Sequence, residues 1–139
     1  MAGTYSVTGN AVNISAGANS YVQEAVLDFS TTNLGIDETI DVFQIPANTL
    51  VASVGYEIIT ASTGAGEIDL GDSASAVAFL ADQDGDAVDG ASAFGLGKSY
   101  DAASEVLLKA TTAAFDGKIR VVAVMAPLSL SSRTGEAFA

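Results

Sequence analysis

The sequence contains no cysteine and no histidine. Without cysteine the chain can form no disulfide, and it offers no thiolate to a metal ion or to a nucleophilic reaction. Without histidine it lacks the commonest general base and the commonest ligand of transition metals. Because most hydrolytic triads need one of these two residues, the sequence predicts a protein that is not an enzyme.

Basic residues are scarce as well, since the chain has five lysines and arginines against seventeen acids and a net charge of −12. They are spread along the chain without forming a run: Lys98, Lys109, Lys118, Arg120 and Arg133. A surface that binds DNA, RNA or an anionic membrane needs clustered basic side chains. We therefore expect no nucleic-acid partner and no membrane partner.

Long apolar runs are also absent, because no stretch approaches the ~18 residues of a membrane-spanning helix. The opening residues MAGTYSVTGN have neither the basic nor the apolar region of a signal peptide, so we expect neither a signal peptide nor a membrane span.

Charged residues make up only 16% of the chain. The surface of a free monomer is normally richer in charge, which indicates that part of this surface packs against other subunits.

Short segments of alternating polar and apolar residues, separated by glycine, proline, asparagine and aspartate, make up most of the chain. This pattern is typical of β-strands. Residues 104–111 also have a composition that suits a helix, but strands surround them and we favour a strand. The expected strands cover residues 21–29, 39–45, 49–61, 67–72, 76–81, 104–111 and 118–128.

The connections between these segments carry turn signals. We expect a hairpin between the segments 49–61 and 67–72, a hairpin-type turn at Asp116–Gly117, and a long loop from Asp82 to about Ser99. The absence of a convincing amphipathic helix favours an all-β fold. The sequence therefore predicts a single antiparallel β-sandwich or jelly-roll-like domain, with extended N- and C-terminal arms.

The domain boundaries follow from composition. Residues 1–20 are predicted to be an extended N-terminal arm, residues 21–128 the sandwich domain, and residues 129–139 a C-terminal tail. Arms that become ordered on binding can join neighbouring subunits. We expect contacts with such neighbours from Tyr5 and Val7, and from Phe138, for which a disordered end is the alternative.

Residues 39–128 resemble small virion proteins of tailed bacteriophages, of the head-decoration or cement type. The matching stretches are DVFQIPANTLVASVGYEIITA, GEIDLGDSASAVAFLA and DGKIRVVAVMAPL. They reproduce a strand that ends in IPA, a valine-rich strand, a strand ending in LGD, an acidic glycine-rich loop, and a final strand of alternating valines. The resemblance covers about two thirds of the chain.

The resemblance implies a β-sandwich subunit without chemistry of its own. Such a subunit is made in the host cytoplasm and binds the major capsid protein on the outer capsid surface of the virion. It also associates with itself, often as a homotrimer. The expected function is therefore that of a decoration or cement protein that stabilises the capsid.

Four aspartates lie close together in the segment DQDGDAVDG, namely Asp82, Asp84, Asp86 and Asp89. The first three match positions 1, 3 and 5 of an EF-hand loop, where calcium needs oxygen ligands. Ala87 and Ala93 replace the turn glycine and the closing carboxylate. A solvated acidic turn and a weak calcium site both stay open. The second would favour a calcium-dependent carbohydrate-binding or fibre module of a virion or cell surface.

Overall fold

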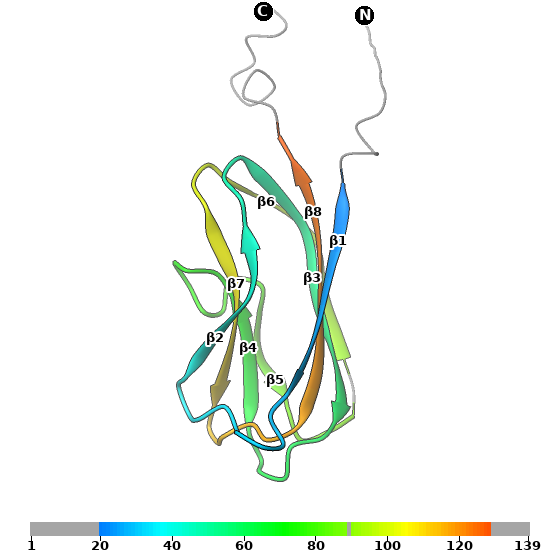
Figure 1. Ribbon diagram of the computed structural model, residues 1–139, viewed down its shortest axis with the longest axis vertical. Helices are drawn as coiled ribbons and strands as arrows, with labels where there is room; N and C mark the ends of the chain where they lie inside the picture. Colours follow the sequence, from blue (N-terminus) through cyan, green and yellow to red (C-terminus); the bar gives the residue numbers. More distant parts are fainter. Residues whose placement is uncertain (1–19, 89, 129–139) are drawn as a thin grey trace, which may run out of the picture.

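The computed structural model describes residues 20–88 and 90–128 as two packed β-sheets. Each sheet has four antiparallel strands, in the orders β1-β8-β3-β6 and β2-β7-β4-β5 (Figure 1). Within the described residues no helix is long and apolar enough to cross a membrane. The strands are β1 (Tyr21–Asp28), β2 (Thr39–Ile45), β3 (Thr49–Thr60), β4 (Glu67–Gly71), β5 (Leu80–Asp84), β6 (Gly90–Tyr100), β7 (Ser104–Thr111) and β8 (Lys118–Pro127).

The connectivity of the strands is that of a jelly roll. Consecutive strands lie in opposite sheets, except for β4 and β5, which pair with each other in one sheet. Eight strands arranged in two sheets in this way give the double-sheet jelly roll. The predicted all-β sandwich of jelly-roll type is confirmed.

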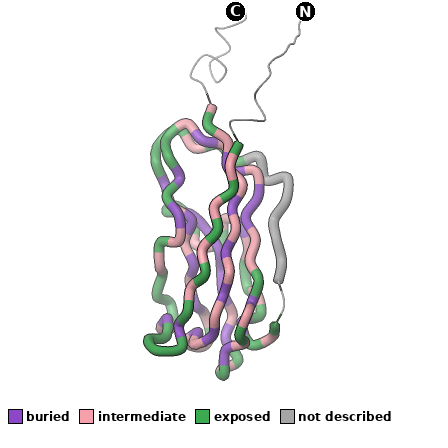
Figure 2. Tube along the Cα trace, turned by 45° about the vertical axis from the view of Figure 1, so that its right-hand side comes forward, coloured by how far each residue is buried: buried purple, intermediate pink, exposed green. Residues whose placement is uncertain are grey.

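Alternation along the strands places the core between the sheets. In β8 every second residue, from Ile119 to Met125, is fully buried, and the residues between them are half-buried, as the alternation in the sequence predicts. Figure 2 shows this change from buried to less buried residues along the chain. The largest fully buried side chains come from both sheets: Phe115, Ile45, Ile58, Ile68, Leu70, Leu108, Ile119, Met125, Val51, Val54, Val106 and Val121.

Strand β3 departs from the unbroken alternation that its sequence predicts. Leu50, Val54 and Ile58 were expected to share one face, but Leu50 is half-buried whereas Val51 and Val54 are both fully buried. The cause is a β-bulge at Ala52, where the register of β3 shifts against both β6 and β8. An extra residue in one strand reverses the alternation beyond it. Both halves of β3 thereby bury apolar side chains.

The two predicted hairpins are wrong. β3 and β4 lie in opposite sheets, and so do β7 and β8. Both connections pass over the same end of the sandwich, where the carboxylate of Asp116 accepts hydrogen bonds from the Ser62 hydroxyl at 2.9 Å and the Thr63 amide at 2.8 Å. Glycine and aspartate mark a chain reversal, but they do not say which sheet the next strand enters.

The predicted loop from Asp82 to Ser99 is also wrong, because it contains the end of β5 and most of β6. β5 starts at Leu80, later than the expected segment 76–81. β6 is rich in small residues and shows no alternation that would identify a strand. Its pairing with β3 along most of its length supplies the structure that local propensity does not predict.

Gly117 permits a close approach between the two crossover connections. A Cβ atom at this position would lie 2.2 Å from the backbone oxygen of Thr60. At Gly64, in the same region, the nearest atom would lie at 3.5 Å, which is an ordinary contact. The two glycines therefore differ in how much room their surroundings leave.

We expect the substitution Gly117→Ala to lower the free energy of unfolding by about 2 kcal/mol, because overpacking forces the backbone of the neighbouring connection to move. Gly64→Ala is the matched control and should change stability little. Thermal unfolding followed by circular dichroism measures both. Equal melting temperatures for the two variants would contradict the close approach at Gly117.

Candidate functional site

The predicted calcium ligands lie on β5 and in the turn after it. Asp82, Asp84 and Asp86 are exposed, whereas Asp89 lies outside the described residues. Asp82 has a left-handed backbone with a φ of 55°, and its amide donates to Asp69 Oδ1 at 2.8 Å. The Asp86 amide donates to Asp84 Oδ1 at 3.1 Å, which closes a local turn.

The carboxyls of Asp84 and Asp86 influence each other. Hydrogen bonds from Asp86 lower the pKa of Asp84, and the neighbouring Asp84 raises the pKa of Asp86. Among the described residues no three carboxylates come together in a way that could hold a metal ion. With Asp89 outside this part of the chain, the calcium site of the four aspartates stays a prediction.

Two buried aspartates nearby were not identified from the sequence as structural residues. Asp69 and Asp72 are 4% and 2% exposed. Asp69 sits at an outward position of β4, where alternation predicts exposure, and it is covered because its carboxylate holds the Asp82 amide. Asp72 follows β4 directly, and its two carboxylate oxygens have different partners.

Asp72 joins the two sheets. Its Oδ2 lies 2.6 Å from Lys98 Nζ and accepts a hydrogen bond from the Tyr100 hydroxyl, also at 2.6 Å. Both partners are on β6, in the sheet opposite β4. Its Oδ1 accepts from the amides of Ala74 and Ser75 at 3.0 and 2.9 Å. We call this group the Asp72 clasp.

The clasp is reflected in the pKa of Asp72. Burial alone would raise this pKa, but the hydrogen bonds from Lys98, Tyr100 and the two amides outweigh burial and lower it from 3.8 to about 2. Burial and the hydrogen bond to Asp72 in turn raise the pKa of Tyr100. A carboxylate held by four donors is a structural anchor, because no acceptor capacity is directed toward a substrate.

We expect Asp72→Asn to lower the free energy of unfolding at neutral pH by about 2 kcal/mol, the equivalent of the pKa shift. Because the folded-state pKa is lowered, the stabilisation is present above pH 3.8 and is lost as the pH falls through about 2. Urea denaturation over a pH series measures this difference. Asp41→Asn, at an exposed position of β2, is the control. A deficit that stays constant down to pH 2 would contradict the clasp.

The outer face of the sheet that contains β1 carries four valines on two adjacent strands. Val22 and Val26 of β1 are 65% and 50% exposed, and Val122 and Val124 of β8 are half-buried on the same face. The register aligns Val22 with Val124, and Glu24 with Val122. On β3, Gly55 lies opposite Val122 and adds no side chain above it. We call Val22, Val26, Val122 and Val124 the valine face.

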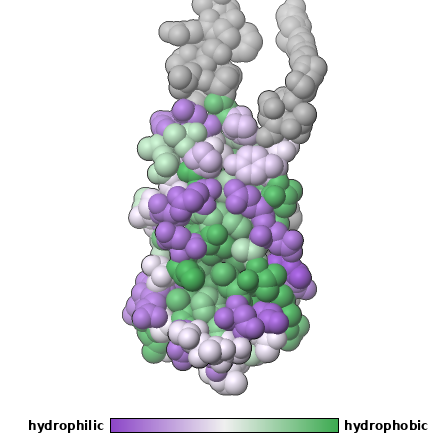
Figure 3. All heavy atoms as spheres, in the orientation of Figure 1, coloured by the Kyte–Doolittle hydropathy of each residue, from purple (hydrophilic) through white to green (hydrophobic). Residues whose placement is uncertain are grey.

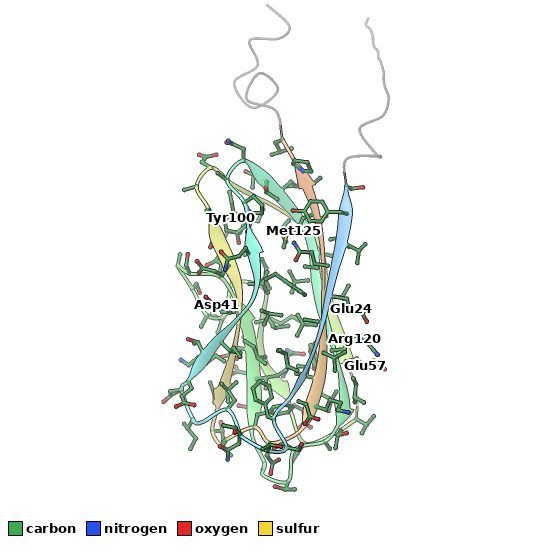
Figure 4. The ribbon with its side chains drawn as sticks, viewed as in Figure 1. Glu24, Asp41, Glu57, Tyr100, Arg120 and Met125 are labelled. Carbon is green, nitrogen blue, oxygen red and sulfur yellow. The ribbon has the colours of Figure 1, made fainter. Side chains whose placement is uncertain are left out.

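The acids on this face are matched by bases. Arg120 lies between Glu24 and Glu57, and Figure 4 shows the three side chains close together. Arg120 Nε is 2.6 Å from Glu24 Oε2, which makes the two side chains an ion pair. Lys118 Nζ lies 3.9 Å from Asp28 Oδ2.

The outer face of the other sheet is polar by comparison. On this face Thr39 of β2 lies beside Lys109 of β7, and Lys109 lies beside Asp69 of β4. Further polar outward positions of this sheet are Asp41, Gln44, Glu67, Glu105 and Thr111. The two faces of the sandwich therefore differ, since one carries four valines among ion-paired residues and the other is polar and acidic.

One lateral side of the sandwich is less closed than the other. β1 and β2, the edge strands of the two sheets, lie on the same side, and Figure 3 shows hydrophobic residues gathered between hydrophilic ones there. On the opposite side β5 and β6 contact each other, and the Tyr56 hydroxyl donates to Gln83 Oε1 at 3.2 Å. Apolar side chains of β1 and β2 pack against the core but remain half-buried: Tyr21, Ala25, Leu27, Ile40 and Val42.

The predicted arm contacts lie outside the described residues. Tyr5 and Val7 precede residue 20, and Phe138 follows residue 128. Their contacts with neighbouring subunits stay a prediction. The valine face was only partly predictable, since the alternation in β8 indicates a second face that ends in apolar residues but not that Val22 and Val26 continue it.

No family model matches the chain, and the search of curated proteins finds no match either. Solved structures do match. A chain of the cyanophage Pam1 capsid asymmetric unit aligns with a TM-score of 0.66 and 20% identity, over 91% of this chain and 99% of that chain. A chain of the Ralstonia phage GP4 capsid aligns with a TM-score of 0.63 and 13% identity, over 85% and 90%.

A third match is a chain of the acid-stable capsid of Helicobacter pylori bacteriophage KHP30. It aligns with a TM-score of 0.59 and 15% identity, over 79% of this chain and 89% of that chain. At these identities the matches establish a common fold. The resemblance to small phage virion proteins, drawn from residues 39–128, is confirmed at the level of the fold.

Proposed function

We propose that this protein is a non-enzymatic structural component of a bacteriophage virion, which binds the outer capsid surface and stabilises it as a decoration protein. The observation that carries the proposal is the jelly roll, which matches chains of three phage capsid structures over most of both chains. A fold alone does not determine function, so the surface must supply the rest of the argument.

The valine face is the part of the described surface best suited to contact the major capsid protein. It holds four valines, and its acids are matched by Arg120 and Lys118. An interface needs an apolar centre with few uncompensated charges. With a net charge of −12 on the chain, the face against the shell should be the one on which acids are paired.

The opposite sheet suits exposure to solvent. Its outward acids keep the particle surface hydrated and repel other particles of the same charge. The small number of charged residues elsewhere supports association between copies, and the resemblance to decoration proteins implies a symmetric oligomer, often a trimer. Sedimentation velocity of the purified full chain counts the subunits.

The valine face can be tested by Val124→Glu, which replaces one of its half-buried valines with a charged residue. We expect binding to purified capsid shells of the same virus to weaken at least tenfold, because a buried unpaired carboxylate is costly. Co-sedimentation with shells measures binding, and circular dichroism confirms that the variant is folded. Val88→Glu, at a position 70% exposed and outside this face, is the matched control. Unchanged binding by the Val124 variant would rule out this docking face.

A further inference from the structure

β1 is an edge strand that is poorly covered on both of its faces. Within the described residues it pairs only with β8, so one edge of its backbone has no strand beside it. Its inward residues are all half-buried, and its outward residues are all exposed. No residue of β1 reaches the full burial seen for alternate residues of β8. An edge of this kind is a template for another strand.

The inward polar groups of β1 support the same conclusion. Gln23 points its side-chain amide toward the core, where its Nε2 lies 3.8 Å from Met125 Sδ. The hydroxyl of Tyr21 lies 3.7 Å from the same sulfur. A thioether is a weak acceptor, so these groups are only weakly satisfied. The residues of a strand beside β1 would cover these half-buried side chains further.

We propose that β1 pairs in antiparallel fashion with β1 of a second copy, so that two four-stranded sheets join across a two-fold axis into one continuous sheet. This inference deepens the self-association part of the proposed function. It predicts a dimer contact in place of the trimer that the resemblance implies. A two-fold interface brings the same strand from both copies together, so β1 must be complementary to itself.

The side-chain pattern restricts the register of such a pair. Residues opposite each other in adjacent strands must share a face, since a slip of one residue turns inward side chains outward. For a two-fold pair of β1 strands of eight residues, the two well-overlapped registers are centred on Glu24 or on Ala25. The two registers bring different side chains together.

The register centred on Glu24 matches residues of the same kind. It places Val22 opposite Val26 of the second copy on the outer face, and Tyr21 opposite Leu27 on the inner face. Cross-strand pairs of apolar residues stabilise sheets by about 0.2–1 kcal/mol each. The register centred on Ala25 would instead place Val22 opposite Asp28. The geometry therefore favours Glu24 as the centre.

The central pair of glutamates is the cost of this arrangement. Like charges directly opposite each other destabilise a sheet. Here each Glu24 carboxylate lies 2.6 Å from Arg120 Nε of its own chain, which reduces the repulsion. The net charge of −12 on each copy adds a long-range repulsion that salt screens. The dimer should therefore be tighter at high ionic strength.

Cysteine crosslinking tests the register, because the chain has no native cysteine. In full-length Glu24→Cys the two introduced thiols face each other across the axis and should form a disulfide-linked dimer under mild oxidation. In Val22→Cys they would be about 13 Å apart, four residues along the strand, which is too far for a disulfide. We expect at least tenfold faster crosslinking at position 24. Equal rates at both positions would overturn the proposal.

Sedimentation equilibrium of full-length variants gives a second measurement. Glu24→Gln should tighten the dimer several-fold, because it removes the central repulsion, and Val26→Glu should weaken it at least tenfold. Val88→Glu is the control. A monomer at all concentrations, or a Glu24→Gln variant that dimerises less well, would refute the contact. Both experiments omit capsid shells, so their failure is distinguishable from a failure of the proposed capsid binding.

Discussion

The packing of the central strand pairs, β3 with β8 in one sheet and β4 with β7 in the other, is the interaction on which the rest of the structure depends. Their inward side chains are fully buried, as at Val54, Val121, Leu70 and Leu108. Burial of apolar area is the dominant stabilising term in a fold of this size, which has no disulfide to help it. The edge strands and the connections are then free to carry other properties.

The sequence predicted those parts of the fold that depend on local alternation. β8 is an example, since the period of two from Ile119 to Met125 survives intact in the structure. The bulge at Ala52 was not predictable, because its cause is the pairing of β3 with β6 and β8 on both sides. The sheet entered after each turn was equally inaccessible, since Asp116 and Gly117 have the same local signature in a hairpin and in a crossover.

The candidate site was predictable to a smaller extent. The acidic segment after Asp82 is visible in the sequence, but nothing local indicates that Asp69 and Asp72 are buried and hold amides or a lysine from other segments. Likewise, Val22 and Val26 alternate with inward residues as in any strand. Only the register with β8 shows that Val22 extends the apolar row of Val124, and that Val26 lies opposite Arg120 on the same face. Properties that arise from several strands together can be predicted only when the strand topology is known.

The bulge in β3 also has a meaning for the evolution of the chain. Before it, odd-numbered positions such as Val51 face the core, and after it the even-numbered positions Val54 and Ile58 do. In the first half of the strand odd-numbered positions must therefore keep side chains that can be buried, and in the second half even-numbered positions must do so. A single-residue deletion between Val51 and Val54 would remove the bulge and turn the side chains of one half of the strand away from the core. Deletions between these two residues should therefore be selected against more strongly than substitutions.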